Sequence, residues 1–296
     1  MSSTAELASP ADTPALRGAR RSGGKGSNTR LRLPGFLRPI GTVWLLLLIL
    51  VAWEIFARLS PTIFFPPLSD VVVQFRNDWL TKDPTSLFLS QQFWDSVPVS
   101  LGRLAGGWLL AAVVGILFGA VLGRSPLMSA MYQPIVRFFM AVPNAALLPI
   151  AFQIFGAHSS MNIFLIFAGT VWLVIINTAD GMSGVDPQWV RSARSLHLSK
   201  FALYRQVLLP AASPSIMAGL RVSLSIGLIL MIVSELYATT SGLGFDVMLY
   251  QQSFRYHQMW SSFVLIALIG VVLNMGMNVI EKRMLRWQRR SGLGDL

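Results

Sequence analysis

The sequence predicts an all-α, polytopic membrane protein with six transmembrane helices, and three observations lead to this prediction. Hydrophobic residues make up 53% of the 296 residues and charged residues only 12%, whereas soluble domains carry about 25% charged residues. Apolar stretches recur along the chain at close to the roughly 20 residues that a membrane-spanning helix needs. Lysine and arginine gather in alternate connections between these stretches, as the positive-inside rule describes for multi-span proteins.

The six predicted spans are nearly free of charge. The stretch from Phe138 to Ala179 holds 42 residues without Lys, Arg, Asp or Glu, which is too long for one span. The polar cluster Phe155–Asn162 divides this stretch into one helix before it and one after it. The six spans are therefore Ile40–Ala57, Leu104–Gly123, the two parts of Phe138–Ala179, Ile216–Ala238 and Tyr256–Ile280.

The charges of the connections predict the orientation. The tail before Ile40 carries seven basic residues against two acidic ones, and the segment Asp180–Ser213 carries four against two. The connection Leu59–Asp95 has the opposite balance, with four acidic and two basic residues. Because positive segments stay in the cytoplasm, we expect a multi-pass protein of a prokaryotic cytoplasmic membrane with both termini inside.

Composition divides the chain into three parts. Residues 1–39 are rich in Ser, Gly, Pro and Arg and lack apolar periodicity, which predicts a disordered basic tail that meets anionic lipid near its end. Residues 40–290 form the predicted transmembrane domain, and residues 291–296 form a short C-terminal tail. The first apolar run begins too late for a signal peptide and lacks a small-residue cleavage site.

The cytoplasmic segment 186–210 is patterned as a pair of short amphipathic helices. Asp186 suits an N-cap and Pro187 the first helical position, and Ser199 can cap a second helix. Pro210 and Pro214 are expected to end this second helix and to redirect the chain into the next span. Trp189, Ala193 and Leu196 fall on one helical face, and Phe201, Tyr204 and Leu208 align in the second helix. An apolar face needs a cover, which is either this protein's own spans and the membrane surface or a soluble partner.

The spacing of this segment resembles the cytoplasmic signature of ABC importer permeases, the inner-membrane components of binding-protein-dependent transporters. That signature reads E-A-A, three residues, G, nine residues and I-x-L-P. Residues 191–193 (Arg-Ser-Ala) occupy the first positions, His197 occupies the glycine position, and Val207–Pro210 form the end. Ala193 and the final Leu-Pro match, while the residues at 191, 192 and 197 depart. Because the glycine position is a turn, we expect His197 near the left-handed region or in a slightly different bend.

The resemblance extends over about residues 40 to 290 and is most similar to the nitrate/sulfonate/taurine subgroup of these permeases. It rests on the order and spacing of several pieces rather than on one motif. These pieces are Phe65–Val72, Ser100–Gly107, Gly115–Gly123, Val142–Pro149, Ser234–Leu236 and Ser241–Gly244.

The resemblance implies a type I importer permease fold and a set of partners. Two copies of a cytoplasmic ABC ATPase would drive two permease copies, expected to be a homodimer, between inward- and outward-facing states. An extracytoplasmic solute-binding protein would deliver the solute to the outer face. The residues implied in coupling to the ATPase are Arg191, Ser192, Ala193, Leu196, His197, Leu198, Ser199, Phe201, Tyr204, Val207, Leu209 and Pro210.

Polar groups within the spans are candidates for the translocation path. The residues placed there are Pro143, Asn144, Asn177, Ser223, Ser234 and Glu235. Glu235 would line the outer half of the path or hold the following loop, with an acid that simply reaches water as the alternative. Buried amides and hydroxyls also join helices to one another, and this alternative stays open. Glu54, Arg103 and Arg221 lie near span ends, where snorkelling to the interface is sufficient.

Two backbone features are predicted within the spans. Glycines spaced by four residues, at Gly102/Gly106 and Gly115/Gly119/Gly123, favour close helix packing. Pro143 and Pro149 predict a bend near the translocation path, because proline interrupts the helical hydrogen bonds and irregular backbone in a membrane faces protein or a cavity.

The sequence holds no pattern for catalysis. It lacks Cys, H-E-x-x-H, G-x-S-x-G and a phosphate-binding loop, so we expect no catalytic residue, no metal, no cofactor and no nucleic-acid partner. Energy would then come from a separate ATPase or from an ion gradient. The main prediction is the permease subunit of an ATP-driven importer for a small anionic solute of the nitrate, sulfonate or taurine kind. The alternative is a secondary transporter, which requires functional intramembrane carboxylates.

Overall fold

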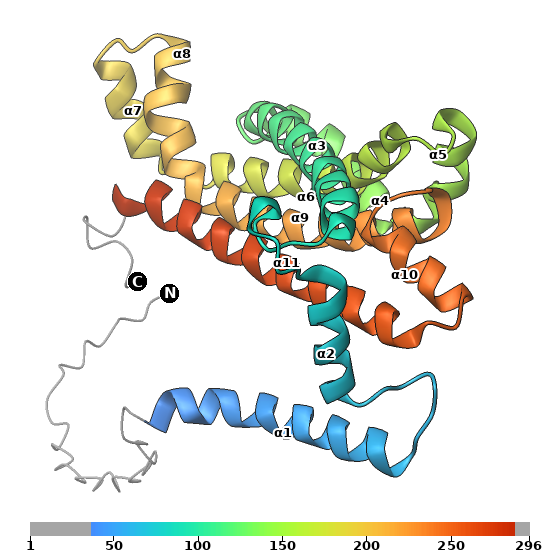
Figure 1. The fold of residues 1–296 in the computed structure, drawn as a ribbon. Helices are drawn as coiled ribbons and strands as arrows, with labels where there is room; N and C mark the ends of the chain where they lie inside the picture. The colour runs from blue at the N-terminus through green and yellow to red at the C-terminus, as the bar shows by residue number, and fades with distance from the viewer. Residues whose placement is uncertain (1–36, 288–296) are drawn as a thin grey trace, which may run out of the picture. The chain divides into compact units, whose positions relative to one another are not determined.

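The computed structural model describes residues 37–287, which are almost entirely helical (Figure 1). The predicted tails, residues 1–39 and 291–296, lie outside the described residues except for positions 37–39. Contacts divide the chain into two units, residues 1–49 and 50–296, and the description below concerns the second unit unless stated. The described residues contain isolated β-bridges but no β-strand.

Four described helices are long and apolar enough to cross a membrane: α3 (Gln91–Leu122), α6 (Ser159–Ser183), α9 (Leu209–Ala238) and α11 (Tyr256–Met284). A bent pair of helices would add a fifth span if the pair crosses as one. Helix α1 (Leu37–Leu59) covers the predicted first span. The count of six spans and the orientation of the termini stay predictions.

The predicted bend at the prolines is present. Helix α4 (Pro126–Ala141) ends before Pro143, and the chain continues as η2 (Asn144–Leu147) and α5 (Leu148–Phe155) at an angle of 84° to α4. The part of the predicted span from Phe138 to Phe155 is thus divided at Pro143 into two helical pieces. The predicted break at Phe155–Asn162 is confirmed, since α5 ends at Phe155 and α6 begins at Ser159.

Two predicted connections contain helices of their own. The segment before α3 holds α2 (Leu68–Trp79) and the 3₁₀ turn η1 (Pro84–Ser86), and the segment after α9 holds α10 (Leu243–Gln252). Helix α2 packs against α11, and the indole of Trp79 donates to Ser261 Oγ at 2.8 Å. Near the end of α1, Trp53 stacks on Phe65 and meets Trp260 edge-on. These contacts fix the connecting segments onto α11.

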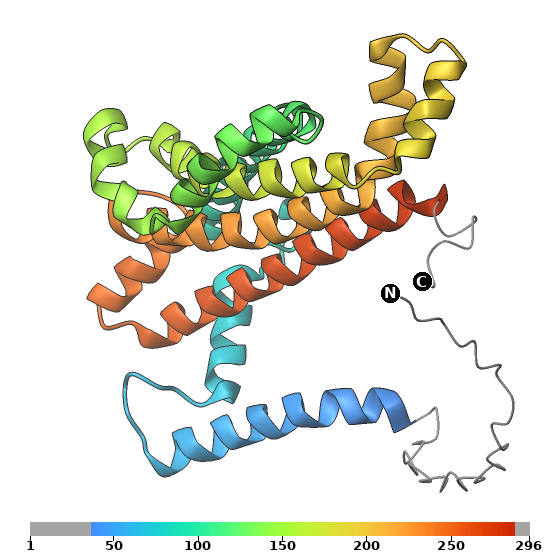
Figure 2. The same cartoon turned by 180° about the vertical axis from the view of Figure 1, so that it is seen from behind.

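The centre of the second unit is the packing of α3, α6 and α9. Helices α6, α9 and α11 run side by side in Figure 2, and α3 packs against α6 and α9. A Cβ atom added at Gly115, Gly119 or Gly123 would lie within 2.4–2.7 Å of atoms of α6, so only glycine allows this approach. The prediction of close packing is confirmed there. It was wrong at Gly102, where nothing lies within 4 Å of an added Cβ.

Candidate functional site

The segment 186–210 forms a helical hairpin, which stands at one end of the second unit (Figure 1). It consists of α7 (Pro187–Ser195), a turn, α8 (Lys200–Leu203) and the π-helical turn η3 (Tyr204–Leu208). The two predicted caps are confirmed. The Asp186 carboxylate accepts from the backbone N–H of Gln188 at 2.7 Å, and Ser199 Oγ accepts from that of Ala202 at 3.2 Å.

The turn of the hairpin is a Schellman motif with His197 at the left-handed position. His197 has φ of 54°, which confirms the expected conformation. Its N–H donates to Arg194 O at 2.9 Å, and the N–H of Leu198 donates to Ala193 O at 3.2 Å. These two bonds satisfy carbonyls that the end of α7 would otherwise leave free, so histidine keeps the turn that a glycine would make at lower cost.

The second arm of the hairpin does not end at its prolines, which corrects the prediction. Helical backbone runs without interruption from Lys200 to Ala238. The π-helical turn η3 precedes Pro210, and a widened turn of this kind relieves the clash that a proline ring makes with the preceding turn. Pro214 cannot donate to Pro210 O, and the Ser213 hydroxyl donates to that carbonyl instead, at 2.7 Å.

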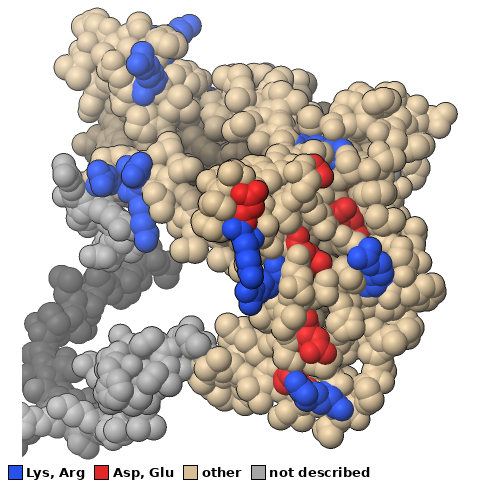
Figure 3. All heavy atoms as spheres, viewed as in Figure 1, with Lys and Arg blue, Asp and Glu red and all other residues tan. Residues whose placement is uncertain are grey.

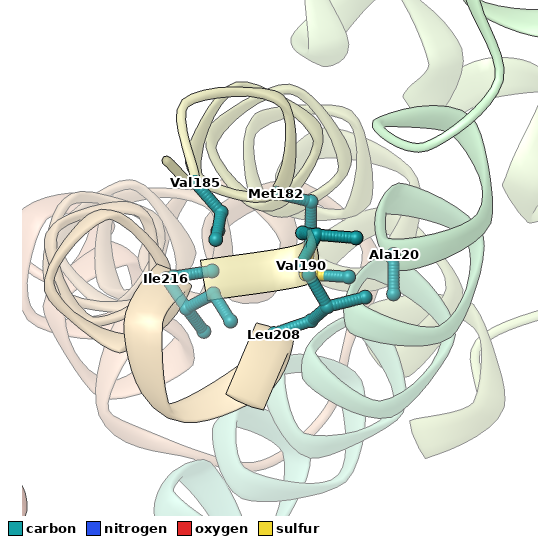
Figure 4. Close-up of a cluster of buried hydrophobic side chains, with 7 residues drawn as sticks. Ala120, Met182, Val185, Val190, Leu208 and Ile216 are labelled. Carbon is teal, nitrogen blue, oxygen red and sulfur yellow. The ribbon is translucent and has the colours of Figure 1, made fainter. Parts of the chain in front are cut away.

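The root of the hairpin is anchored in a hydrophobic core (Figure 4). Val190 and Leu208, one from each arm, are buried there against three spans. Their neighbours in the core are Met182 and Val185 from the end of α6, Ile216 of α9 and Ala120 of α3. The hairpin is therefore fixed to the same three helices whose packing builds the second unit.

The tip of the hairpin exposes its largest apolar side chains. Leu196 and Phe201 are each 74% exposed, and Trp189 is 42% exposed. The predicted face Trp189–Ala193–Leu196 is thus divided, because Ala193 is buried. Lys and Arg side chains gather on the hairpin and at the end of α11 on the face shown in Figure 3. Apolar side chains at an exposed tip flanked by cations are typical of a surface that docks on another protein.

A hollow of about 400 Å³ lies beside the hairpin. Six residues predicted for coupling line it, namely Ser192, Ala193, Leu196, Leu198, Val207 and Pro210. Trp287 from the end of α11 completes the wall. The sequence analysis missed Trp287, because this residue is about 80 positions from the hairpin in the sequence.

At the other end of α9, Glu235 and Arg103 form a buried ion pair. Arg103 Nη1 lies 2.7 Å from Glu235 Oε1, and the two side chains are 6% and 0% exposed. The prediction that Arg103 only snorkels to water was wrong. The sequence contained the signal, since a charged residue buried in a span is expected to have a partner, but the two residues lie 132 positions apart.

The other charged residues near span ends are also paired. Glu54 accepts from Arg58 Nε at 2.6 Å and from Ser69 Oγ at 3.0 Å, so it does more than reach water. Arg221 of α9 pairs with Glu281 of α11, and its side chain is 38% exposed. This pair joins the hairpin-side halves of the two helices.

The remaining residues predicted for the path lie in contacts between or within helices. The Asn177 carbonyl accepts from Ser215 Oγ at 2.8 Å, and Ser223 Oγ accepts from the Trp108 indole at 2.9 Å. Ser234 is buried and donates to its own helix. Asn144, beside Pro143 at the bend, packs over Gly169 of α6. Such contacts fit the alternative in which these groups join helices, and their place in a path stays a prediction.

Within residues 37–287, no group of three His, Asp or Glu side chains is arranged to hold a metal ion. The distinctive features of the second unit are the exposed apolar tip of the hairpin at one end of α9 and the buried ion pair at the other.

Comparison with known proteins gives a family match. Residues 111–290 match the model of the binding-protein-dependent transport system inner membrane component. The bicarbonate transport system permease protein CmpB of Synechococcus elongatus is 32% identical over 80% of this chain and 87% of its own length. The taurine transport system permease protein TauC of Escherichia coli is 29% identical over 84% of this chain and 88% of its own length. The putative aliphatic sulfonates transport permease protein SsuC of Bacillus subtilis is 28% identical over 81% and 84%.

Two solved structures share the fold. The inward-facing MetNI methionine ABC transporter aligns with a TM-score of 0.57 at 17% identity, over 69% of this chain and 99% of the matched chain. A bacterial alginate ABC transporter, solved with an alginate-bound periplasmic protein, aligns with a TM-score of 0.57 at 15% identity, over 84% and 97%. Both support the same arrangement of helices.

Proposed function

The chain belongs to the binding-protein-dependent transport system inner membrane component family, and on that premise we propose how it works and what it carries. It is a permease subunit of an ABC importer rather than an enzyme. The proposed cargo is a small anion of the nitrate, sulfonate, bicarbonate or taurine class, which are the solutes that its relatives' names give. The solute would cross the cytoplasmic membrane with the hairpin end facing the cytoplasm.

The observation that carries this proposal is the hairpin. Its root is fixed in the core of α3, α6 and α9, while its tip presents Leu196 and Phe201 to solvent. A tip of this kind can insert into a groove on a soluble ATPase, and a rigid root can pass movement of that ATPase to the spans. We propose that the twelve residues assigned to coupling act in this way, with Leu196 and Phe201 as the contacts and His197 as the turn that separates them.

The proposed assembly has two permease copies, two ATPase copies and one external solute-binding protein. The α10 end of the molecule would then face outward and receive the binding protein. The residues at the bend, Pro143 and Asn144, are proposed to border the translocation path, because a broken helix in a membrane is tolerated beside a cavity. We propose that four polar residues hold the helices that surround that path in position, namely Asn177, Ser223, Ser234 and Glu235.

The docking proposal is tested with the double variant Leu196→Asp/Phe201→Asp. Both side chains are exposed, so insertion and folding should be retained while the apolar contact with the ATPase is lost. We expect the ATPase to stop co-purifying and solute-stimulated ATP hydrolysis to disappear. The matched control is Leu196→Met/Phe201→Leu, which keeps apolar side chains at both positions. Normal coupling in the Asp variant would show that the hairpin is not the docking surface.

The assembly is tested by isolating the tagged chain from its native membranes in mild detergent and identifying each subunit that accompanies it by mass. An ATPase and a solute-binding protein are expected, and the binding protein can then be screened with nitrate, bicarbonate, sulfonates and taurine. If the chain is isolated alone and a proton or sodium gradient drives uptake, secondary transport replaces the proposed function.

A further inference from the structure

A polar stripe on α3 joins that helix to α10. Gln92, Ser96 and Ser100 are spaced by four residues and so share one helical face. Gln92 is hydrogen-bonded to the Tyr250 hydroxyl, and Ser96 Oγ donates to the Asp246 carboxylate at 2.5 Å. Ser100 Oγ accepts from the backbone N–H of Leu243 at 2.9 Å and donates to Glu235 at 2.8 Å. We call the hydrogen bonds of these three residues, together with those of Arg103, the α3–α10 seam.

Glu235 caps α10 from a neighbouring helix. Its Oε2 accepts from the backbone N–H of Gly244 at 3.0 Å, in the first turn of α10. A carboxylate at this position satisfies a free N–H and faces the positive end of the helix dipole. The loop closes tightly over the carboxylate, since a Cβ atom at Gly242 would lie 2.5 Å from Glu235 Oε1. Gly242 also has φ of +110°, which only glycine adopts readily.

Arg103 ties this cap to three other elements. Its Nη1 donates to Glu235 Oε1 and to Ser241 O, each at 2.7 Å, and its Nη2 donates to Ser241 Oγ at 3.1 Å. Its Nε donates to Ser159 Oγ, at the start of α6, at 3.1 Å. One guanidinium therefore connects α3, α6, α9 and the loop that leads into α10.

The other side of α10 is held differently. Leu243 and Val247 are buried in an apolar cluster with Trp79 of α2, Val97 of α3 and Leu265 of α11. The surface that α10 leaves open includes Leu249 at 44% exposure and, just after the helix, Phe254 at 72%. Helix α10 thus stands between an exposed surface and the polar seam to α3.

We infer that Arg103 and Glu235 are positioning residues for transport, which hold α10 so that contact of the solute-loaded binding protein with α10 is passed through the seam to α3 and α9. This inference rests on the proposed function and names the residues at the α10 end through which contact with the binding protein would reach the spans. Apolar packing holds α10 to α2, α11 and α3, and the seam adds directional hydrogen bonds and an ion pair that fix the start of α10 relative to α3 and α9.

The test uses the complete complex in lipid nanodiscs with its ATPase and binding protein. In Glu235→Gln, a side chain of the same shape loses the charge that Arg103 and α10 recognise. We expect the complex to assemble and stimulation of ATP hydrolysis by solute-loaded binding protein to fall by about tenfold, within the range of allosteric couplings. Ser100→Ala keeps the ion pair and loses the hydrogen bonds of Ser100 Oγ to Glu235 and from the N–H of Leu243, so a smaller fall is expected. This variant serves if Glu235→Gln fails to assemble.

Rescue separates positioning from a purely structural role. Because this chain has no Cys, a short thiol-reactive cross-linker can join Ser96→Cys to Asp246→Cys without reacting elsewhere in the permease. Cross-linking α3 to α10 in the Glu235→Gln background should restore most of the stimulation. Normal stimulation in Glu235→Gln, or no recovery on cross-linking when the same cross-link leaves the parent chain active, would overturn the inference. Absence of stimulation in the unmodified complex would instead overturn the proposed function.

Discussion

The two ends of α9 differ in the kind of contact that holds them: apolar packing at the hairpin end and buried polar bonds at the α10 end. At the hairpin end, apolar residues form both the buried root, with Val190 and Leu208, and the exposed tip, with Leu196 and Phe201. At the α10 end, Arg103 and Glu235 lie buried in a network of hydrogen bonds. A surface that must bind a soluble partner keeps apolar groups outside. A loop that must keep one conformation inside a membrane protein is held by directional polar bonds, each of which specifies a position.

Arg103→Met is expected to have the largest effect, because it tests whether the buried ion pair stabilises the α10 end. It leaves the Glu235 carboxylate buried without its cation, and removal of one partner from a buried pair costs about 3–5 kcal/mol. We expect a large fall in the thermal unfolding temperature of the detergent-solubilised chain. The double variant Arg103→Met/Glu235→Met removes both charges and should recover a large part of that loss. Equal unfolding temperatures for Arg103→Met and the unmodified chain would mean that the pair is not buried.

The packing between the two ends is tested by Gly119→Ala. The added Cβ would lie 2.6 Å from Ile175 O and from the Cβ of Thr178, so α3 and α6 must separate. Overpacking of this kind costs about 1–3 kcal/mol. Gly102→Ala is the matched control on the same helix, where the new methyl meets nothing within 4 Å. The unfolding temperature should fall for the first variant and stay level or rise for the second.

The hairpin end responds in the opposite direction to His197→Gly. A residue with a side chain pays about 1–2 kcal/mol in the left-handed conformation of His197. Glycine avoids this cost but loses about 0.5–1 kcal/mol in backbone entropy, so the turn should gain up to about 1 kcal/mol. His197→Val should lose stability, because a β-branched residue is poorly accommodated at positive φ. Amide hydrogen exchange of the hairpin measures both effects locally. Protection that is the same in all three chains would show that the turn does not limit hairpin stability.

The smallest expected effect is a pH dependence at the α10 end. Burial raises the pKa of the Asp246 carboxyl above its ordinary value, while the hydrogen bond from Ser96 opposes the shift. Because the folded pKa is raised, the contribution of Asp246 to stability is present at low pH and is lost as the pH rises through the folded pKa. Asp246→Asn abolishes this dependence. Its unfolding temperature should rise relative to that of the parent chain as the pH increases above about 4, and a constant difference would contradict the assignment.

Local signals in the sequence were sufficient for the hairpin. The Asp186-Pro187 start, the Ser199 cap and the left-handed turn at His197 depend on residues within a few positions of one another. The division at Phe155–Asn162 is local in the same sense. The length of the apolar spans is likewise readable from composition, because the thickness of the bilayer sets the number of apolar residues that a spanning helix needs.

The features that sequence analysis missed depend on partners far along the chain or on compensation. Arg103 looked like an interfacial cation because Glu235 is 132 residues away. Pro214 looked like a helix end because proline has no N–H to donate. The helix continues because the hydroxyl of the neighbouring Ser213 donates to the Pro210 carbonyl instead. Trp287 lines the hollow beside the hairpin only because the fold brings the end of α11 next to it. A propensity describes a residue alone, and tertiary contacts decide these positions.

The uninterrupted helix through Pro210 has a mechanical consequence. The rod from Lys200 to Tyr237 has 38 residues, a length of about 57 Å at 1.5 Å per residue. It carries the second arm of the hairpin at one end and Glu235 near the other. If the rod tilts as a rigid body by about 10° around its midpoint, both ends move by about 5 Å in opposite directions. Had the prolines ended the helix, a joint would separate the two ends and each could move alone.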